Sequence, residues 1–165
     1  MYIPKNMNQI TDKVWLGNSA SARNIDGLKS NGISKVLSVM NNPPCKYNIR
    51  DKIILKHISI YDKPGENIIK YFGECLNFMD GNENVLVHCI FGKSRSACIV
   101  VAYLMWKEKK NLNDALNFVN EKRKMATPNI GFKKQLKIFE ELLILNNYDL
   151  NKIDFKNIKW EYNSK

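Results

Sequence analysis

The feature that most constrains the fold is a short apolar segment that leads through a glycine-containing loop into a long apolar helix. Asn84–His88 contains three consecutive apolar residues between turn formers, which is typical of a strand buried inside a parallel sheet. The next residues, 89–94, include Gly92, and residues 94–110 are predicted to form a helix. This order of strand, loop and helix suits an anion, because loop N–H groups and the helix dipole place positive charge at one point.

Strand and helix patterns alternate along the rest of the chain. Alternating β-branched residues predict strands over 33–40 and 52–60, and one or two short strands are expected within 9–17. Apolar residues at steps of three and four predict the other helices, over 20–30, 64–80, 113–122 and 131–145. We therefore expect an α/β fold with a central mixed, mostly parallel sheet flanked by helices.

The length of 165 residues indicates one domain, expected over 8–146. The tail, 147–165, is expected to form an extra helix or to wrap around that domain. With 44% hydrophobic and 25% charged residues, the chain has a core to bury. Its most apolar run, Cys98–Trp106, is much shorter than the roughly 20 residues needed to cross a bilayer. Because this run is too short, we expect no membrane span. Residues 1–5 lack an apolar signal core, so we expect a cytoplasmic or nuclear location.

Four cysteines are scattered without a pair or cluster at metal-ligand spacing: Cys45, Cys75, Cys89 and Cys98. We expect neither a metal site, nor a disulfide framework, nor a cofactor. The formal net charge of +10 is compatible with nucleic acid, an anionic membrane or phosphorylated partners, because all three attract Lys and Arg through the same field. Most of the basic residues are expected to lie on solvated faces.

Cys89, the first residue of the loop, is the candidate nucleophile. A thiol at such a positive site is readily ionised, and the planar guanidinium of Arg95 can bind two oxygens of a tetrahedral oxyanion. A free cysteine is more commonly a buried core residue. The presence of His88, Gly92 and Arg95 at this same junction favours the catalytic interpretation.

The loop sequence resembles that of a known superfamily. Residues 88–96, HCIFGKSRS, resemble the HCxxGxxRS loop of the cysteine-dependent phosphatases, and residues 102–105 are similar to the AYLM stretch of dual-specificity phosphatases. Similarity extends to residues 14–18, 33–39, 128–132 and the region of Asp62. The resemblance implies that 8–146 is a small atypical dual-specificity phosphatase domain with the α/β sandwich of the cysteine phosphatases.

The resemblance also implies an activity and a set of roles. The expected activity is metal-free hydrolysis of phosphate monoesters on phosphotyrosine and phosphoserine or phosphothreonine proteins, through a phosphocysteine on Cys89. Ser96 would help the sulfur to leave, His88 would orient the loop and support the thiolate, and Asn129 would help to shape the pocket. The phosphate would bind to the loop residues Ile90, Phe91, Gly92, Lys93, Ser94 and Arg95.

Asp62 follows a predicted strand, at the place where the family carries its general acid. A loop aspartate beside proline and glycine is also a common turn former, and Glu66 is the alternative acid. Asn129 can likewise serve as the N-cap of the last helix.

Lys93 and Phe91 depart from the residues common in the family. A cation in the loop favours phosphoinositide or RNA 5′-phosphate substrates as the alternative function. A third possibility, an inactive phosphate-binding module, is less favoured because nucleophile, arginine and acid are all present. Lys124 could form a second anion site with Lys93, or simply end a solvated helix. We expect phosphorylated protein partners, no nucleic acid and a monomer.

Overall fold

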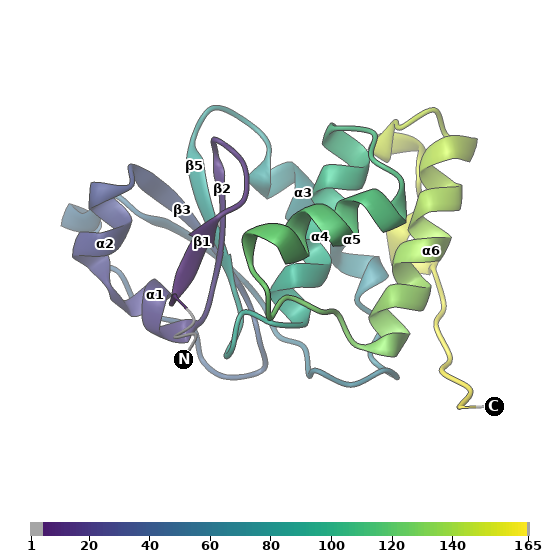
Figure 1. Ribbon diagram of the computed structural model, residues 1–165, viewed down its shortest axis with the longest axis horizontal. Helices are drawn as coiled ribbons and strands as arrows, with labels where there is room; N and C mark the ends of the chain where they lie inside the picture. The colour runs from purple at the N-terminus through teal and green to yellow at the C-terminus, as the bar shows by residue number, and fades with distance from the viewer. Residues whose placement is uncertain (1–4, 165) are drawn as a thin grey trace.

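The computed structural model describes residues 5–164 and contains a five-stranded sheet with helices on both faces (Figure 1). The strands are β1 (Met7–Gln9), β2 (Val14–Gly17), β3 (Ile33–Val39), β4 (Ile54–Ile58) and β5 (Asn84–His88). The helices are α1 (Ser19–Arg23), α2 (Ile25–Ser30), α3 (Phe72–Met79), α4 (Arg95–Lys107), α5 (Leu112–Lys122) and α6 (Ile130–Leu145). Short 3₁₀ helices are η1 (Ile49–Asp51), η2 (Ile69–Tyr71), η3 (Leu150–Lys152) and η4 (Phe155–Asn157). Residues 1–4, which carry most of the expectation about targeting, lie outside the described range.

The strand order is β1-β2-β5-β3-β4, with β1 antiparallel to β2 and the other pairs parallel. This confirms the predicted mixed, mostly parallel sheet. The central strand β5 has the predicted bounds and lies between β2 and β3, in register with Gly17 and Ser38 at His88. The parallel strands end at one edge of the sheet, so the loops that follow β3, β4 and β5 meet there, as at ligand sites of other open α/β sheets.

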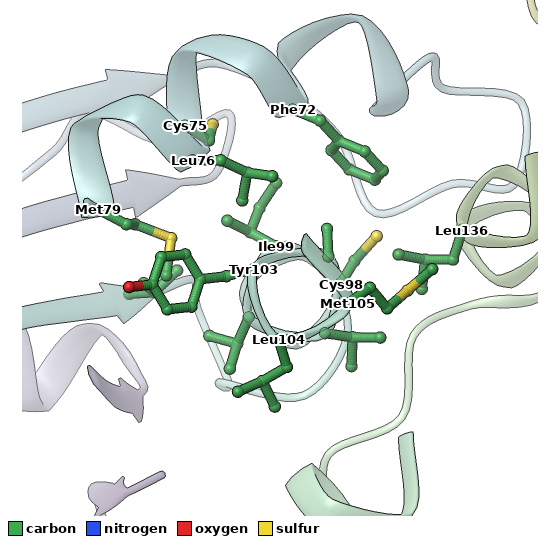
Figure 2. Packing of buried hydrophobic residues seen from close by; sticks show 14 of the residues in the cluster. Phe72, Cys75, Leu76, Met79, Cys98, Ile99, Tyr103, Leu104, Met105 and Leu136 are labelled. Atoms are coloured by element: carbon green, nitrogen blue, oxygen red, sulfur yellow. The ribbon is translucent and has the colours of Figure 1, made fainter. Parts of the chain in front are cut away.

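Two helical layers cover the sheet (Figure 1). α1 and α2 lie on one face, over a small apolar cluster that includes Trp15, Leu28 and Leu86. α3 to α6 lie on the other face, where α4 is central: each of its residues from 95 to 105 is buried. Figure 2 views α4 end on, with side chains of α3 on one side and Leu136 of α6 on another. Burial on all sides holds the N-terminus of α4 in a defined place at the end of β5.

Two predicted helices differ from the observed ones. The helix expected over 20–30 is two helices, because the Asn24 side chain accepts a hydrogen bond from Gly27 N and so begins α2 anew. The helix expected over 64–80 begins only at Ile69. The backbone N–H groups of Ile68 and Ile69 donate to the side chain of Gln135, which keeps the preceding residues as a loop.

The strand expected over 52–60 is also shorter. It begins at Ile54, since Lys52 adopts a left-handed conformation (φ 54°) that ends η1.

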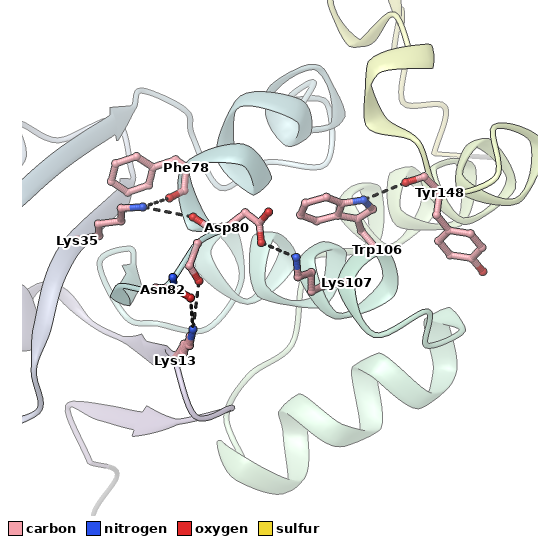
Figure 3. Close-up of polar contacts among 9 residues, drawn as sticks. Lys13, Lys35, Phe78, Asp80, Asn82, Trp106, Lys107 and Tyr148 are labelled. Atoms are coloured by element: carbon pink, nitrogen blue, oxygen red, sulfur yellow. Dashed lines mark hydrogen bonds and ion pairs between the residues drawn. The ribbon is translucent and has the colours of Figure 1, made fainter.

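The tail packs on the domain. Leu150, Ile153 and Phe155 are buried in the larger core, so the packed unit extends beyond residue 146. Trp106 Nε1 donates to Tyr148 O at 3.0 Å and so connects the start of the tail to α4 (Figure 3).

Part of the positive charge has a structural role far from the end of β5. Lys35 Nζ donates to two carbonyls at the end of α3, those of Phe78 (3.2 Å) and Asp80 (3.3 Å), and Lys107 forms a 2.7 Å ion pair with Asp80 (Figure 3). Cations at a helix C-terminus are favourable because its last carbonyls have no partner within the helix. Among residues 5–164, no helix is both long and apolar enough to span a membrane.

Candidate active site

The loop between β5 and α4 has a conformation that requires glycine. Gly92 lies in the left-handed region, with φ +64°. A Cβ at this position would overlap the carbonyl group of Gly17 and the guanidinium of Arg123. The loop therefore depends on the absence of a side chain at residue 92.

Arg123 holds the loop from outside. Its side chain is 1% exposed, and it donates from Nε to Gly92 O at 2.8 Å and from Nη2 to Phe91 O at 3.1 Å. In a trans peptide the N–H points opposite to the carbonyl, so the N–H groups of Gly92 and Lys93 point away from Arg123. The sequence analysis missed this contact, because Arg123 stands between two lysines in what reads as a surface cluster.

Cys89 lies at the base of the loop, and its Sγ is 3.1 Å from Ser96 Oγ in the first turn of α4. A thiolate can only accept, so when Cys89 is ionised the Ser96 hydroxyl donates this hydrogen bond. Cys75 and Cys98 are in the core, where burial raises the pKa of each thiol above its usual range. Cys89 is thus the cysteine that the fold places beside a helix N-terminus.

Arg95, the first residue of α4, is 5% exposed. Its Nη1 donates to Asn41 Oδ1 at 3.0 Å and to Ile60 O at 3.1 Å. Its Nε is buried and has no hydrogen-bond partner among residues 5–164. A buried donor needs an acceptor, and an oxygen of a bound oxyanion suits this one. Asn41 carries no functional signal in the sequence, where it simply follows the predicted strand over 33–40.

Asp62 is held at the loop by two hydrogen bonds to one of its oxygens. Oδ1 accepts from Ser94 Oγ at 2.7 Å and from Asn129 Nδ2 at 2.8 Å. Asn129 N in turn donates to Ser94 Oγ at 2.9 Å, and Asn129 also caps α6 through its side chain, as the sequence analysis allowed. The alternative acid, Glu66, contacts Gln135 through its backbone carbonyl, and no hydrogen bond joins its side chain to the loop in the described range.

His88 is fully buried at the end of β5, with Nδ1 3.2 Å from Cys89 O. Burial, together with the charges of Arg23 and His57, lowers the pKa of His88 to about 4. The ring is therefore neutral at neutral pH, and since a carbonyl can only accept, Nδ1 carries the proton. His88 contacts the backbone of the nucleophile and contributes no positive charge there.

Lys93 and Lys124 are both exposed. Thr127 N donates to Lys93 O at 2.7 Å, which brings the segment before Pro128 against the loop. In the part of the chain that the structure describes, no three side chains of His, Cys, Asp or Glu are grouped so that they could bind a metal.

The family model of the dual specificity phosphatase catalytic domain matches residues 14–142. The chain belongs to the dual specificity phosphatase family. Dual specificity protein phosphatase 1 of Arabidopsis thaliana is 40% identical over 136 residues, which cover 80% of this chain and 68% of that protein. Dual specificity protein phosphatase 1B of the same plant is 38% identical over 141 residues, 83% of each chain.

Solved structures agree with this placement. The crystal structure of DUSP15 superposes with a TM-score of 0.78 at 33% identity, over 82% of this chain and 88% of that one. The predicted fold, family and activity class are confirmed: the chain is a dual specificity phosphatase, a hydrolase of phosphotyrosine and phosphoserine or phosphothreonine proteins.

Proposed function

We propose that this phosphatase works through a phosphocysteine on Cys89, with Asp62 as general acid and then general base. The observation that carries the assignment is the hydrogen bond from Ser94 to Asp62. Ser94 belongs to the loop that begins with Cys89 and precedes Arg95 directly. The nucleophile, the arginine and the acid are thereby attached to one short loop.

In the first step, the Cys89 thiolate forms a bond to phosphorus while the bond from phosphorus to the substrate oxygen breaks. The leaving oxygen takes a proton from Asp62 and departs as an alcohol or phenol. Arg95 and the loop N–H groups bind the three other phosphoryl oxygens, on which charge redistributes during transfer.

In the second step, water attacks the phosphocysteine. Asp62, now a carboxylate, takes a proton from this water, and the phosphorus–sulfur bond breaks to release inorganic phosphate. The departing sulfur is a thiolate again, and the Ser96 hydroxyl, 3.1 Å away, stabilises its charge by donating a hydrogen bond.

The surroundings of the loop suit a phosphorylated protein segment. Three large apolar side chains are exposed next to site residues: Phe91 (68%) beside Gly92, Tyr61 (52%) beside Asp62, and Ile130 (51%) beside Asn129. Exposed aromatic and aliphatic side chains around a polar site provide contact area for the residues that flank the phosphate group. We therefore favour phosphoproteins with apolar residues next to the phosphorylated one.

Phosphate release from phosphotyrosine and phosphothreonine peptides, phosphoinositides and 5′-triphosphate RNA tests this function. Cys89→Ser should abolish release from every substrate, while Cys45→Ser, a matched change of a free cysteine outside the loop, should retain full activity. Asp62→Asn should slow the peptides by about 10² to 10⁴ fold, the usual range for general acid catalysis. Turnover by Cys89→Ser, or faster release from lipid or RNA than from peptides, would contradict the proposal.

A further inference from the structure

The tail beyond residue 146 lies outside the residues that match the family model and still belongs to the packed domain. Phe155 is its main anchor. The Phe155 ring lies 6.0 Å from that of Phe139 in α6 and fills the space beside Gly73 in α3, where a Cβ would come within 2.7 Å of it. The backbone that follows Phe155 therefore leaves the core from a defined position.

From this anchor the chain runs to the loop that carries Asp62. Asn67 Nδ2 donates to Ile158 O at 2.8 Å, and Trp160 Nε1 donates to Pro64 O at 2.8 Å. Further on, the ring of Tyr162 lies 5.0 Å from Nζ of Lys134. Two successive hydrogen bonds thus join the tail to the segment between Asp62 and η2.

On the C-terminal side of Asp62, Pro64 is the first residue of the loop that contacts another element of the structure. Its carbonyl accepts from Trp160 and lies directly against Gly131 in the first turn of α6, where any Cβ would overlap it. Gln135 holds the later part of the loop, at Glu66, Ile68 and Ile69. Residues 61–63 are exposed. The backbone around Asp62 is therefore held by the contacts of its own side chain to the phosphate loop, by Ile60 O on the N-terminal side, which accepts from Arg95, and by Pro64 on the C-terminal side.

We infer that Trp160 is a positioning residue for the general acid, acting through its hydrogen bond to Pro64. The inference rests on the proposed role of Asp62. When Trp160 is bonded, the backbone on both sides of Asp62 is fixed, and the carboxyl group can remain at the phosphate loop. Without this bond, the loop between Asp62 and Asn67 gains freedom, and a smaller share of molecules has the acid in place to protonate the leaving oxygen.

This role predicts a loss that depends on the leaving group. Proton transfer matters for a peptide alcohol or phenol, which leaves poorly, and matters little for an activated aryl phosphate, which leaves without help. Misplacement of a catalytic group by about 1 Å can cost on the order of 10²-fold in rate, so a partial loss of positioning should cost about tenfold. A general loss of folding or of phosphate binding would lower the activity on both substrates alike.

The test uses the chain of 165 residues with Trp160→Phe, which keeps an aromatic ring and removes the N–H donor. We expect kcat/KM for a phosphopeptide to fall about tenfold, with the aryl phosphate and the affinity for vanadate changed by less than about twofold. Tyr162→Phe is the matched control two residues further on and should behave as the parent. A chain that ends after Asn157 keeps the Phe155 anchor and should reproduce the leaving-group dependence of Trp160→Phe.

A second comparison separates this inference from the proposed function. In the Asp62→Asn background, Trp160→Phe should cause no additional leaving-group-dependent loss, because the acid is already absent. If Asp62→Asn is slow on peptides but Trp160→Phe is not, or if Trp160→Phe slows both substrates equally, Trp160 does not position the acid. If Asp62→Asn itself retains full activity, the proposed function fails first.

Discussion

Ser94 Oγ donates a 2.7 Å hydrogen bond to Asp62 Oδ1, across 32 residues of sequence. The same oxygen accepts from Asn129 Nδ2 at 2.8 Å. An oxygen that accepts two hydrogen bonds is a poor place for a proton, so protonated Asp62 carries its proton on Oδ2. In the proposed mechanism Oδ2 is then the atom that donates to the leaving oxygen, and Ser94 and Asn129 determine which way it faces.

Ser94→Ala should therefore slow acid-dependent substrates selectively. The variant loses the donor to Asp62 and the acceptor for Asn129 N, so the carboxyl group is held by one contact instead of two. We expect kcat for a phosphopeptide to fall by about tenfold, with a smaller change for an activated aryl phosphate. Steady-state kinetics on both substrates check this, with Ser30→Ala, on the exposed surface of α2, as the control. Equal losses on both would mean that Ser94 acts on the phosphate loop instead.

Arg123→Lys should weaken the phosphate loop for every substrate. A lysine keeps the charge but cannot bind the carbonyls of Gly92 and Phe91 together. Because buried carbonyls lose their donor, we expect the free energy of unfolding to fall by about 2 to 4 kcal/mol. The affinity for vanadate should fall as well, and peptide and aryl phosphate should be slowed alike. Lys122→Ala, the exposed neighbour, should change neither denaturation nor vanadate binding; a parent-like Arg123→Lys would contradict the role.

His88 should make the protein less stable in acid. Its folded-state pKa of about 4 lies below the 6.5 of an exposed histidine, so between these pH values the unfolded chain binds more protons than the folded one. Stability from this residue is therefore complete above about pH 7 and decreases as the pH falls toward 4, by up to about 3 kcal/mol. Urea denaturation at pH 7, 5.5 and 4.5 checks this, compared with His88→Asn, whose side chain does not titrate. Parallel pH dependences for parent and variant would show that His88 does not contribute.

Lys124 and Lys93 provide the test for a second anion site. The hydrogen bond from Thr127 N to Lys93 O brings the segment that follows Lys124 against the loop, and in the proposed second site a second phosphate or an acidic side chain on the substrate would gain from the charge of both lysines. Doubly phosphorylated peptides should show a higher kcat/KM than monophosphorylated ones, and added salt should reduce this advantage. Lys124→Ala should reduce it by about two- to fivefold at low salt, in line with an exposed charge contact. A ratio that neither salt nor the substitution changes would leave Lys124 as the end of a solvated helix.

The sequence by itself was sufficient for the mixed, mostly parallel sheet, for α5 and α6, and for the reactive loop. β5 has the predicted bounds, and α5 and α6 begin within one residue of the expected positions. These features are local: a short apolar run between turn formers, an apolar repeat of three and four, and a loop whose residues are contiguous from His88 to Ser96. Each is encoded within a window of about 20 residues, so no tertiary information is needed to see it.

Only the tertiary structure decided which polar groups meet. Asn41 reaches Arg95 across 54 residues, Arg123 reaches Gly92 across 31, and Trp160 reaches Pro64 across 96. The same holds for the helix predicted over 64–80. It begins only at Ile69, because the acceptor for Ile68 N is Gln135, 67 residues further on. The types of residues and their spacing in the sequence indicate which positions are buried and which backbone conformation each segment prefers. Which donor satisfies a given buried carbonyl depends on how the layers pack, and that is settled by the burial of the whole core rather than by any segment alone.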